Sequence, residues 1–141
     1  MKITMMLADA VQAVNGKLYV LGGGWSITGP EPVPSAIAVK VEVPWDEGNR
    51  KHGFRLALID GDGQAVRVPG PVGDIPVQVT AEFEAGRPAG LKPGTPLDVV
   101  LALNFGPLPL QPDSRYVWRM WIDEQTREDW EVSFSTRGKV R

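Results

Sequence analysis

The strongest constraint on the fold is the alternation of bulky apolar and polar residues between positions 114 and 136. Large apolar side chains occupy every second position there, in two runs. The first run is Tyr116, Trp118, Met120 and Ile122, and the second is Trp130, Val132 and Phe134. Because successive side chains of a strand point to opposite faces of a sheet, each run predicts a strand with one apolar face. The polar residues 123–129 between the runs can turn the chain, so we expect a hairpin.

The same alternation recurs along most of the chain and favours an all-β fold. It is clear in residues 37–43, 54–58, 77–83 and 97–105, whereas the proline-containing residues 69–76 are expected to be loop. Asn15-Gly16 follows Val14 and precedes the apolar run Leu18 to Leu21, and both residues of the pair tolerate the positive φ angles of a type I′ hairpin turn. No segment has apolar residues at helical spacing over the length of an ordinary helix.

These patterns predict an all-β, single-domain antiparallel β-sandwich with little or no helix, Ig-like or jelly-roll-like. About eight or nine strands are expected from the alternating runs and the turn signals between them. We favour a sandwich over a barrel because two sheets packed face to face seal both apolar faces. The chain of 141 residues has an ordinary domain size, so residues 1–141 are predicted to form one β-sandwich domain.

Composition excludes several classes of function. The chain has no cysteine and one histidine, His52, which excludes disulfides, thiolate metal sites, a cysteine nucleophile and a metal site of several histidines. The net charge is −2 and the 15 basic residues form no stripe, so nucleic acid is not an expected partner. No apolar stretch has the length of a membrane span, and the short apolar N-terminus ends at Asp9. We therefore expect a cytoplasmic protein with no membrane partner and no cofactor.

Asp60, Asp62 and Asp123 are the candidate metal ligands. Asp60-Gly61-Asp62-Gly63 resembles the start of a calcium loop, although position twelve counted from Asp60 is Pro71 and not glutamate. In an up-and-down antiparallel chain, alternate connections lie at the same end of the sheet. The turns at 60–63 and 123–129 should then share an end, provided that residues 64–69 form a crossing strand. The alternative interpretation is that aspartates in a glycine-rich turn serve the turn itself.

His52 is the one ordinary base that titrates near neutral pH. None of the serines lies in a Gly-x-Ser-x-Gly elbow, and the adjacent Arg50 and Lys51 indicate a solvated loop. We therefore do not expect an enzyme, and we predict no catalytic residue.

Tryptophans are the remaining candidates for binding. Trp121 is out of phase with the apolar face of its strand and shares the other face with Val117 and Arg119, a composition typical of interface hot spots. Trp25 follows a glycine run and Trp45 opens a loop. Val117, Arg119, Trp121, Trp25 and Trp45 are thus the candidate binding residues, with burial under a loop as the alternative. The function predicted is a non-enzymatic protein-binding or self-assembling module that forms homo-oligomers; the alternative is a carbohydrate- or calcium-binding module.

Several segments resemble a family of short uncharacterised bacterial proteins that is common in actinobacteria. The segments are Leu7-Ala8-Asp9-Ala10, residues 16–25, residues 106–110 and Arg115-Tyr116-Val117-Trp118. The likeness runs over most of the chain. Since that family has no assigned activity, ligand or catalytic residue, the resemblance implies a bacterial, cytoplasmic protein and assigns no site.

Overall fold

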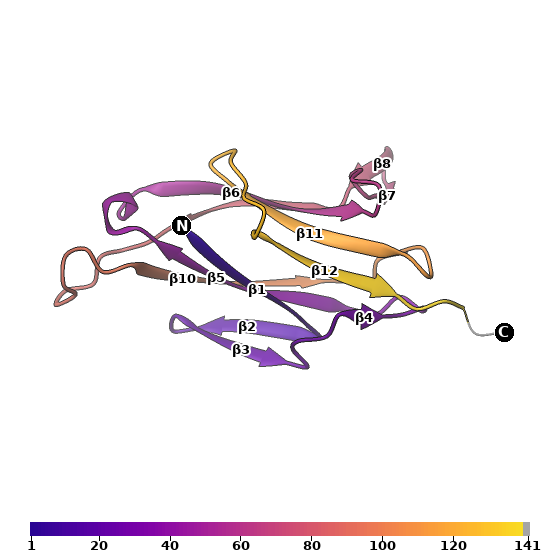
Figure 1. Cartoon of the computed structure of the whole chain (residues 1–141), viewed down its shortest axis with the longest axis horizontal. Coiled ribbons are helices and arrows are strands. Elements are labelled where there is room, and N and C mark those ends of the chain that lie inside the picture. Colours follow the sequence, from indigo (N-terminus) through magenta and orange to yellow (C-terminus); the bar gives the residue numbers. More distant parts are fainter. Residues whose placement is uncertain (140–141) are drawn as a thin grey trace.

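The structure, a computed structural model that describes residues 1–139, is built almost entirely of β-strands (Figure 1). Within these residues the strands are β1 (Lys2–Ala8), β2 (Ala10–Val14), β3 (Lys17–Leu21), β4 (Ile27–Thr28), β5 (Ser35–Val43), β6 (Lys51–Asp60), β7 (Arg67–Gly70), β8 (Gly73–Pro76), β9 (Gln78–Glu84), β10 (Leu97–Phe105), β11 (Arg115–Ile122) and β12 (Glu131–Thr136). One short 3₁₀ helix, η1 (Trp45–Glu47), precedes β6. The prediction of an all-β chain is confirmed.

The strands form four sheets in the described residues. One sheet has the order β1-β5-β10, a second has the order β4-β12-β11-β6-β9, and the hairpins β2–β3 and β7–β8 are separate two-stranded sheets. All pairs are antiparallel except β4 with β12. The strand count exceeds the expected eight or nine because the chain breaks at Asp9 between β1 and β2, and because residues 69–76, expected as loop, belong to the β7–β8 hairpin.

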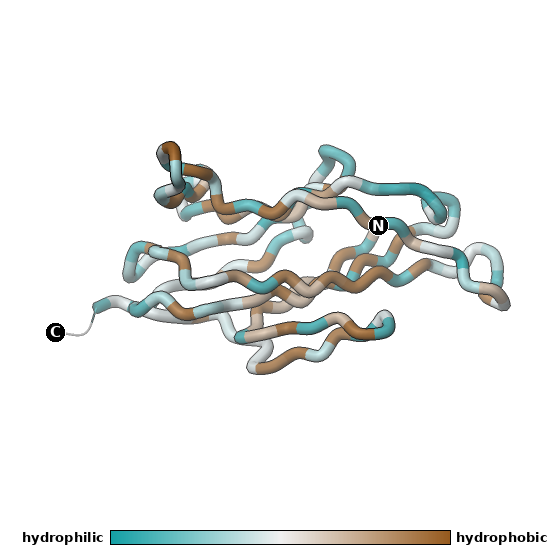
Figure 2. The backbone as a smooth tube through the Cα atoms, turned by 180° about the vertical axis from the view of Figure 1, so that it is seen from behind, coloured by the Kyte–Doolittle hydropathy of each residue, from teal (hydrophilic) through white to brown (hydrophobic). Residues whose placement is uncertain are grey.

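The main core lies between the three-stranded and the five-stranded sheets. Buried side chains of β5, β6 and β11 meet there, and Val41, Leu56 and Met120 are completely buried. Figure 2 shows hydrophobic residues recurring along these long strands. The predicted hairpin at residues 114–136 is confirmed, because β11 and β12 pair with Tyr116 opposite Phe134 and Trp118 opposite Val132.

The β2–β3 hairpin covers part of the outer face of the three-stranded sheet. Its turn, Asn15-Gly16, has φ angles of 51° and 73°, the left-handed values that the sequence predicts for this pair. Val11 and Leu18 pack on alanines of that sheet, Ala36, Ala38 and Ala102. The side-chain amide of Asn104 donates to the carbonyl of Val11 at 2.9 Å and accepts the N–H of Val11 at 3.1 Å. The alanines of the sheet and the side-chain amide of Asn104 therefore hold the hairpin on the sheet.

Candidate functional site

The predicted binding face around Trp121 lies on the outside of the five-stranded sheet, as its strand phase indicates. Val117, Arg119 and Trp121 are each half-buried. Arg119 forms an ion pair with Glu131 on β12, and the guanidinium carbon of Arg55 lies 3.9 Å from the centre of the Trp121 ring. Arg119 and one face of the Trp121 ring are thus engaged by neighbours on the same sheet.

Trp25 and Trp45 lie at opposite ends of the molecule from each other. Trp25 meets Phe134 edge-on at 5.7 Å and lines a cavity of about 40 Å³ with Trp118, beside Ser35 at the start of β5. Trp45 lies in η1, beyond the other end of β5, where Arg87 covers its ring and donates two hydrogen bonds to its carbonyl. The structure therefore does not gather the predicted binding residues into one site.

The three candidate metal ligands also lie apart. Asp60 is paired with Tyr116 at one end of β6, whereas Asp123 accepts the N–H of Gly53 near the other end. The length of β6 separates them by about 20 Å, at ~3.3 Å per residue. The expectation of a shared end is wrong because residues 64–69 do not cross the sheet; β7 instead forms a small hairpin with β8.

Asp60 and Asp62 instead serve their own turn. The Asp60 carboxylate accepts the backbone N–H groups of Asp62 and Gln64 at 2.9 and 3.0 Å. This is the ordinary role of an aspartate in such a turn. Among residues 1–139, no three histidine, aspartate or glutamate side chains are grouped so that they could hold a metal ion.

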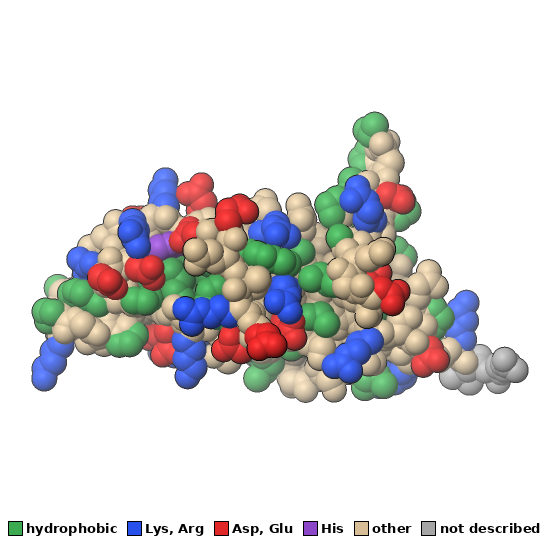
Figure 3. Space-filling view, turned by 45° about the horizontal axis from the view of Figure 1, so that its top comes forward, with side chains coloured by type: hydrophobic (Ala, Val, Ile, Leu, Met, Phe, Trp, Pro, Cys, Tyr) green, Lys and Arg blue, Asp and Glu red, His purple; other side chains and the backbone are tan. Residues whose placement is uncertain are grey.

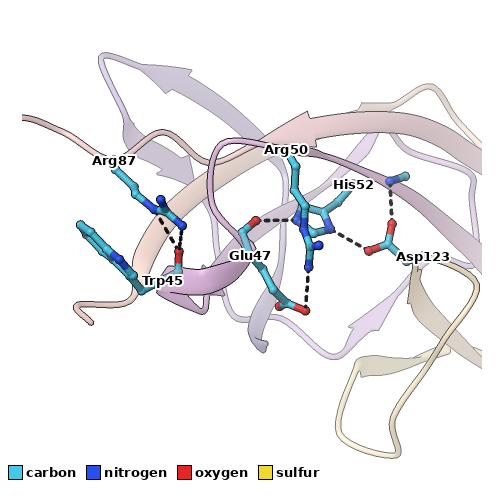
Figure 4. A network of polar contacts seen from close by, with 7 residues as sticks. Trp45, Glu47, Arg50, His52, Arg87 and Asp123 are labelled. Atoms are coloured by element: carbon cyan, nitrogen blue, oxygen red, sulfur yellow. Dashed lines mark hydrogen bonds and ion pairs between the residues drawn. The ribbon is translucent and has the colours of Figure 1, made fainter. Parts of the chain in front are cut away.

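A polar network surrounds His52 at the end of the molecule formed by η1 and the turn after β11 (Figure 4). Nδ1 of His52 lies 2.7 Å from Oδ2 of Asp123, and Nε2 lies 2.8 Å from the carbonyl oxygen of Glu47. Arg50 forms an ion pair with the Glu47 carboxylate at 3.5 Å. The network ties β6 to two loops, one of which is distant in sequence.

His52 is buried, contrary to the solvated loop that its neighbours indicate. Only 2% of the residue is exposed, and its ring stacks on Phe83 at 5.5 Å. The reason is strand phase, since position 52 points inward with Phe54, Leu56 and Leu58 while Lys51 and Gly53 point outward. That phase relation is visible in the sequence and could have identified His52 as a core residue.

The electrostatics of this pair favour the charged ring. Burial is the largest single influence on His52 and lowers its pKa, but the hydrogen bonds to Asp123 and to the Glu47 carbonyl, with the charge of Asp123, outweigh it and raise the pKa. The hydrogen bond from His52 lowers the pKa of the Asp123 carboxyl. Both ring nitrogens are hydrogen-bonded to oxygen atoms of the protein, so neither is left free to take a proton from a substrate.

Exposed apolar side chains gather on a part of the molecule that the sequence reasoning did not single out. We call Met6, Val14, Tyr19, Val20 and Leu21 the N-terminal apolar surface. Tyr19 is 56% and Leu21 is 69% exposed, and both point away from the sheet below. Val20 points to the opposite face of the hairpin, where its side chain and that of Met6 converge over Gly23. The signal in the sequence is the unbroken run Leu18-Tyr19-Val20-Leu21, which makes both faces of β3 apolar.

A second exposed apolar feature is the β7–β8 hairpin, which projects from the body with hydrophobic side chains at its tip (Figure 3). Val72 in its turn is completely exposed and Ile75 is about half exposed. The hairpin and its turn contain prolines at positions 69, 71 and 76.

Comparison with protein families found a match over most of the chain. The model of a family described as Family of unknown function (DUF6941) matches residues 3–134. This confirms the predicted relation to an uncharacterised family; the bacterial origin stays a prediction. Comparisons with curated proteins and with solved structures gave no match. Among residues 1–139, the structure has no helix long and apolar enough to span a membrane.

Proposed function

The chain belongs to this family of unknown function, and from its own geometry we propose that it is a non-enzymatic β-sandwich that associates with copies of itself. The sheets β1-β5-β10 and β4-β12-β11-β6-β9 are the two layers of the sandwich in this proposal. The contact is the N-terminal apolar surface, which lies on the β2–β3 hairpin outside both layers except for Met6 on β1.

The observation that carries the proposal is the concentration of exposed apolar side chains on this surface. Nine large apolar residues of the described chain are strongly exposed, and five of them form it: Met6, Val14, Tyr19, Val20 and Leu21. Single exposed apolar residues are normal on proteins, but larger groups usually mark contacts with other macromolecules. Here Val14, Tyr19 and Leu21 share the outer face of the β2–β3 hairpin, and Met6 and Val20 converge on its other face. The aromatic and aliphatic character of Tyr19 and Leu21 suits a protein contact in particular.

The non-enzymatic part of the proposal is supported by how the reactive side chains are used. Both nitrogens of His52 are hydrogen-bonded to oxygens within the protein, and the Asp60 carboxylate accepts backbone N–H groups of its own turn. The chain contains no cysteine. A hydrolytic site needs a base and a nucleophile that are free to meet a substrate.

Light scattering over a wide range of protein concentration tests the proposal. The molar mass should rise with concentration for the native chain, because association follows mass action. Leu21→Ser should shift the rise to higher concentration, whereas Val72→Ser, a comparable apolar loss on the other hairpin, should leave it unchanged. Trp121→Ala tests the outer face of the five-stranded sheet in the same way. A native chain that keeps a monomer mass at every concentration would overturn the proposal.

A further inference from the structure

We infer that two copies join by antiparallel pairing of β3 with β3 of the second copy, centred on Tyr19. The two β2–β3 hairpins then form one continuous four-stranded sheet. This inference rests on the proposed self-association and specifies its geometry.

The first argument is that β3 has a free edge. In the described residues β3 pairs with β2 alone, and Figure 1 shows it as the outermost strand on its side of the molecule. The carbonyl of Leu21 accepts the N–H of Asp9 at 3.0 Å, so the backbone of Leu21 faces β2. Backbone groups alternate along a strand, and those of Leu18 and Val20 therefore point to the other side. Within residues 1–139, no hydrogen bond from outside the β2–β3 pairing reaches these groups.

The second argument is that this edge has few of the features that usually prevent pairing. Natural edge strands are blocked by charged residues, prolines or bulges. The edge strand β9 has Glu82 and Glu84 near its end, and β7 and β8 contain Pro69 and Pro76. The sequence of β3 is Lys-Leu-Tyr-Val-Leu, with its one charge at the first position.

The third argument is that β3 is complementary to itself in one register. With Tyr19 opposite Tyr19 of the second copy, Leu18 lies opposite Val20 and Lys17 opposite Leu21. The outward N–H and C=O groups of Leu18 and Val20 then exchange hydrogen bonds in two matched pairs. The two Lys17 side chains are kept about 13 Å apart along the strands, at ~3.3 Å per residue.

The neighbouring registers, centred on Leu18 or on Val20, are less suited to antiparallel pairing of two β3 strands. Centring the pair on Leu18 puts Gly16 of the turn opposite Val20 and halves the separation of the two lysines. Centring it on Val20 puts Leu18 opposite Gly22, whose φ of 62° shows that the chain has left the strand. A pair centred on Tyr19 is the one that overlaps all of Lys17–Leu21. It is also a two-fold contact, which closes on itself, so association should stop at two copies.

Cysteine cross-linking tests the register. The chain has no cysteine of its own, so Tyr19→Cys and Leu21→Cys each introduce a single thiol at an exposed position of the same strand. In the inferred register the two copies of position 19 form a non-hydrogen-bonded pair with Cα atoms about 4.5 Å apart, within reach of a disulfide. The two copies of position 21 lie about 13 Å apart, beyond that reach. Under mild oxidation the Tyr19→Cys chain should give severalfold more covalent dimer. Equal or greater dimer from Leu21→Cys would overturn the inference.

Amide hydrogen exchange tests the pairing without any substitution. The N–H of Tyr19 faces β2 and should be protected at every concentration. The N–H groups of Leu18 and Val20 should gain protection only as the molar mass rises, because they are bonded only in the dimer. If the mass rises while these two amides stay unprotected, this inference fails and the proposed self-association stands. If the mass does not rise, the proposed function itself fails.

Discussion

Nδ1 of His52 and Oδ2 of Asp123 lie 2.7 Å apart, and they join β6 to the turn after β11 (Figure 4). The second oxygen of the carboxylate accepts the backbone N–H of Gly53 at 3.1 Å, and the second ring nitrogen donates to the Glu47 carbonyl. Asp123 therefore orients a ring that is almost fully buried and stacked on Phe83. The histidine thus acts as a structural link between three segments of the chain.

We predict that stability falls as the pH rises above about 6.5, the ordinary pKa of a histidine in an unfolded chain. The pKa of His52 is raised in the folded protein, because its hydrogen bonds outweigh the burial that lowers it. Because the folded protein binds this proton more tightly, protonation of His52 stabilises the fold. The contribution is fully present below the pKa of histidine in the unfolded chain, about 6.5, and is lost as the pH rises through the folded pKa. Urea unfolding at a series of pH values should show the decline. His52→Gln should flatten the curve in that window; an unchanged pH dependence would contradict the structural link.

We predict that Asp123→Ala lowers the free energy of unfolding by about 1–3 kcal/mol, the cost of leaving a buried donor without its acceptor. Asp129→Ala, an exposed carboxylate in the same turn, is the matched control and should have little effect. The pKa of Asp123 is lowered, mainly by the hydrogen bond from His52, so its contribution is present above about pH 4 and is lost as the pH falls through the folded pKa. Chemical denaturation of both variants near neutral pH measures the difference. Equal losses would show that the carboxylate does not support the ring.

The sequence predicts strands well where one face is apolar and the other polar. Tyr116, Trp118, Met120 and Ile122 are all buried on β11, and the residues between them are half-buried. The pattern is informative there because each side chain has an unambiguous face. His52 follows the same alternation and points inward. Its charged neighbours do not report on its burial, because Lys51 lies on the opposite face of β6 and Arg50 lies in the loop before it. Strand phase is thus the better guide to burial for a single polar residue.

Topology is harder to predict because it depends on which segments cross the sheet. A single short hairpin at residues 67–76 replaces the expected crossing strand and places Asp123 at the opposite end from Asp60. The sequence does not predict the free edge of β3 either, for a different reason. Tyr19 and Leu21 are bulky and apolar, so the sequence suggests that they are buried. Ala36 and Ala38, which pack only against the other face of the hairpin, are distant along the chain, so the sequence does not show which face stays exposed.

The two tryptophans of β11 should respond very differently to truncation. Trp118 is 2% exposed and stacks on Phe105 at 4.7 Å, so Trp118→Ala should cost about 3–5 kcal/mol. Trp121 is half-buried on the outer face under Arg55, and its loss should cost clearly less. Thermal or urea unfolding of the two variants makes the comparison. A loss for Trp121→Ala as large as that for Trp118→Ala would show that the outer face is covered.

We predict that calcium leaves the thermal stability of the protein unchanged. The Asp60 carboxylate already accepts two backbone N–H groups, and Asp123 lies at the other end of β6. Asp60→Ala should nevertheless destabilise the protein by about 0.5–1.5 kcal/mol through the lost turn hydrogen bonds. Differential scanning calorimetry with calcium and with chelator tests the first statement. If calcium raised the midpoint temperature of unfolding and Asp60→Ala abolished that rise, the turn at Asp60 would have to be a calcium site.

The side chain of Asn104 should control how firmly the β2–β3 hairpin is held on the three-stranded sheet. Its amide satisfies both the N–H and the C=O of Val11, a buried residue on the inner edge of the hairpin. Asn104→Ala removes both partners at once, and each net hydrogen bond contributes about 0.5–1.5 kcal/mol. We expect faster exchange of the Val11 amide and faster proteolysis near Asn15-Gly16, because the hairpin would open locally before the whole protein unfolds.

Asp98→Ala is the matched control for this variant, since Asp98 lies on the same strand and on the same outer face but pairs with Lys40 on β5 instead. It should leave the exchange of the Val11 amide unchanged. If dimerisation proceeds through β3, Asn104→Ala should also weaken the rise of molar mass with concentration, because a loosened hairpin presents its edge less often in the pairing geometry. Unchanged exchange at Val11 in Asn104→Ala would mean that the alanine contacts alone hold the hairpin in place.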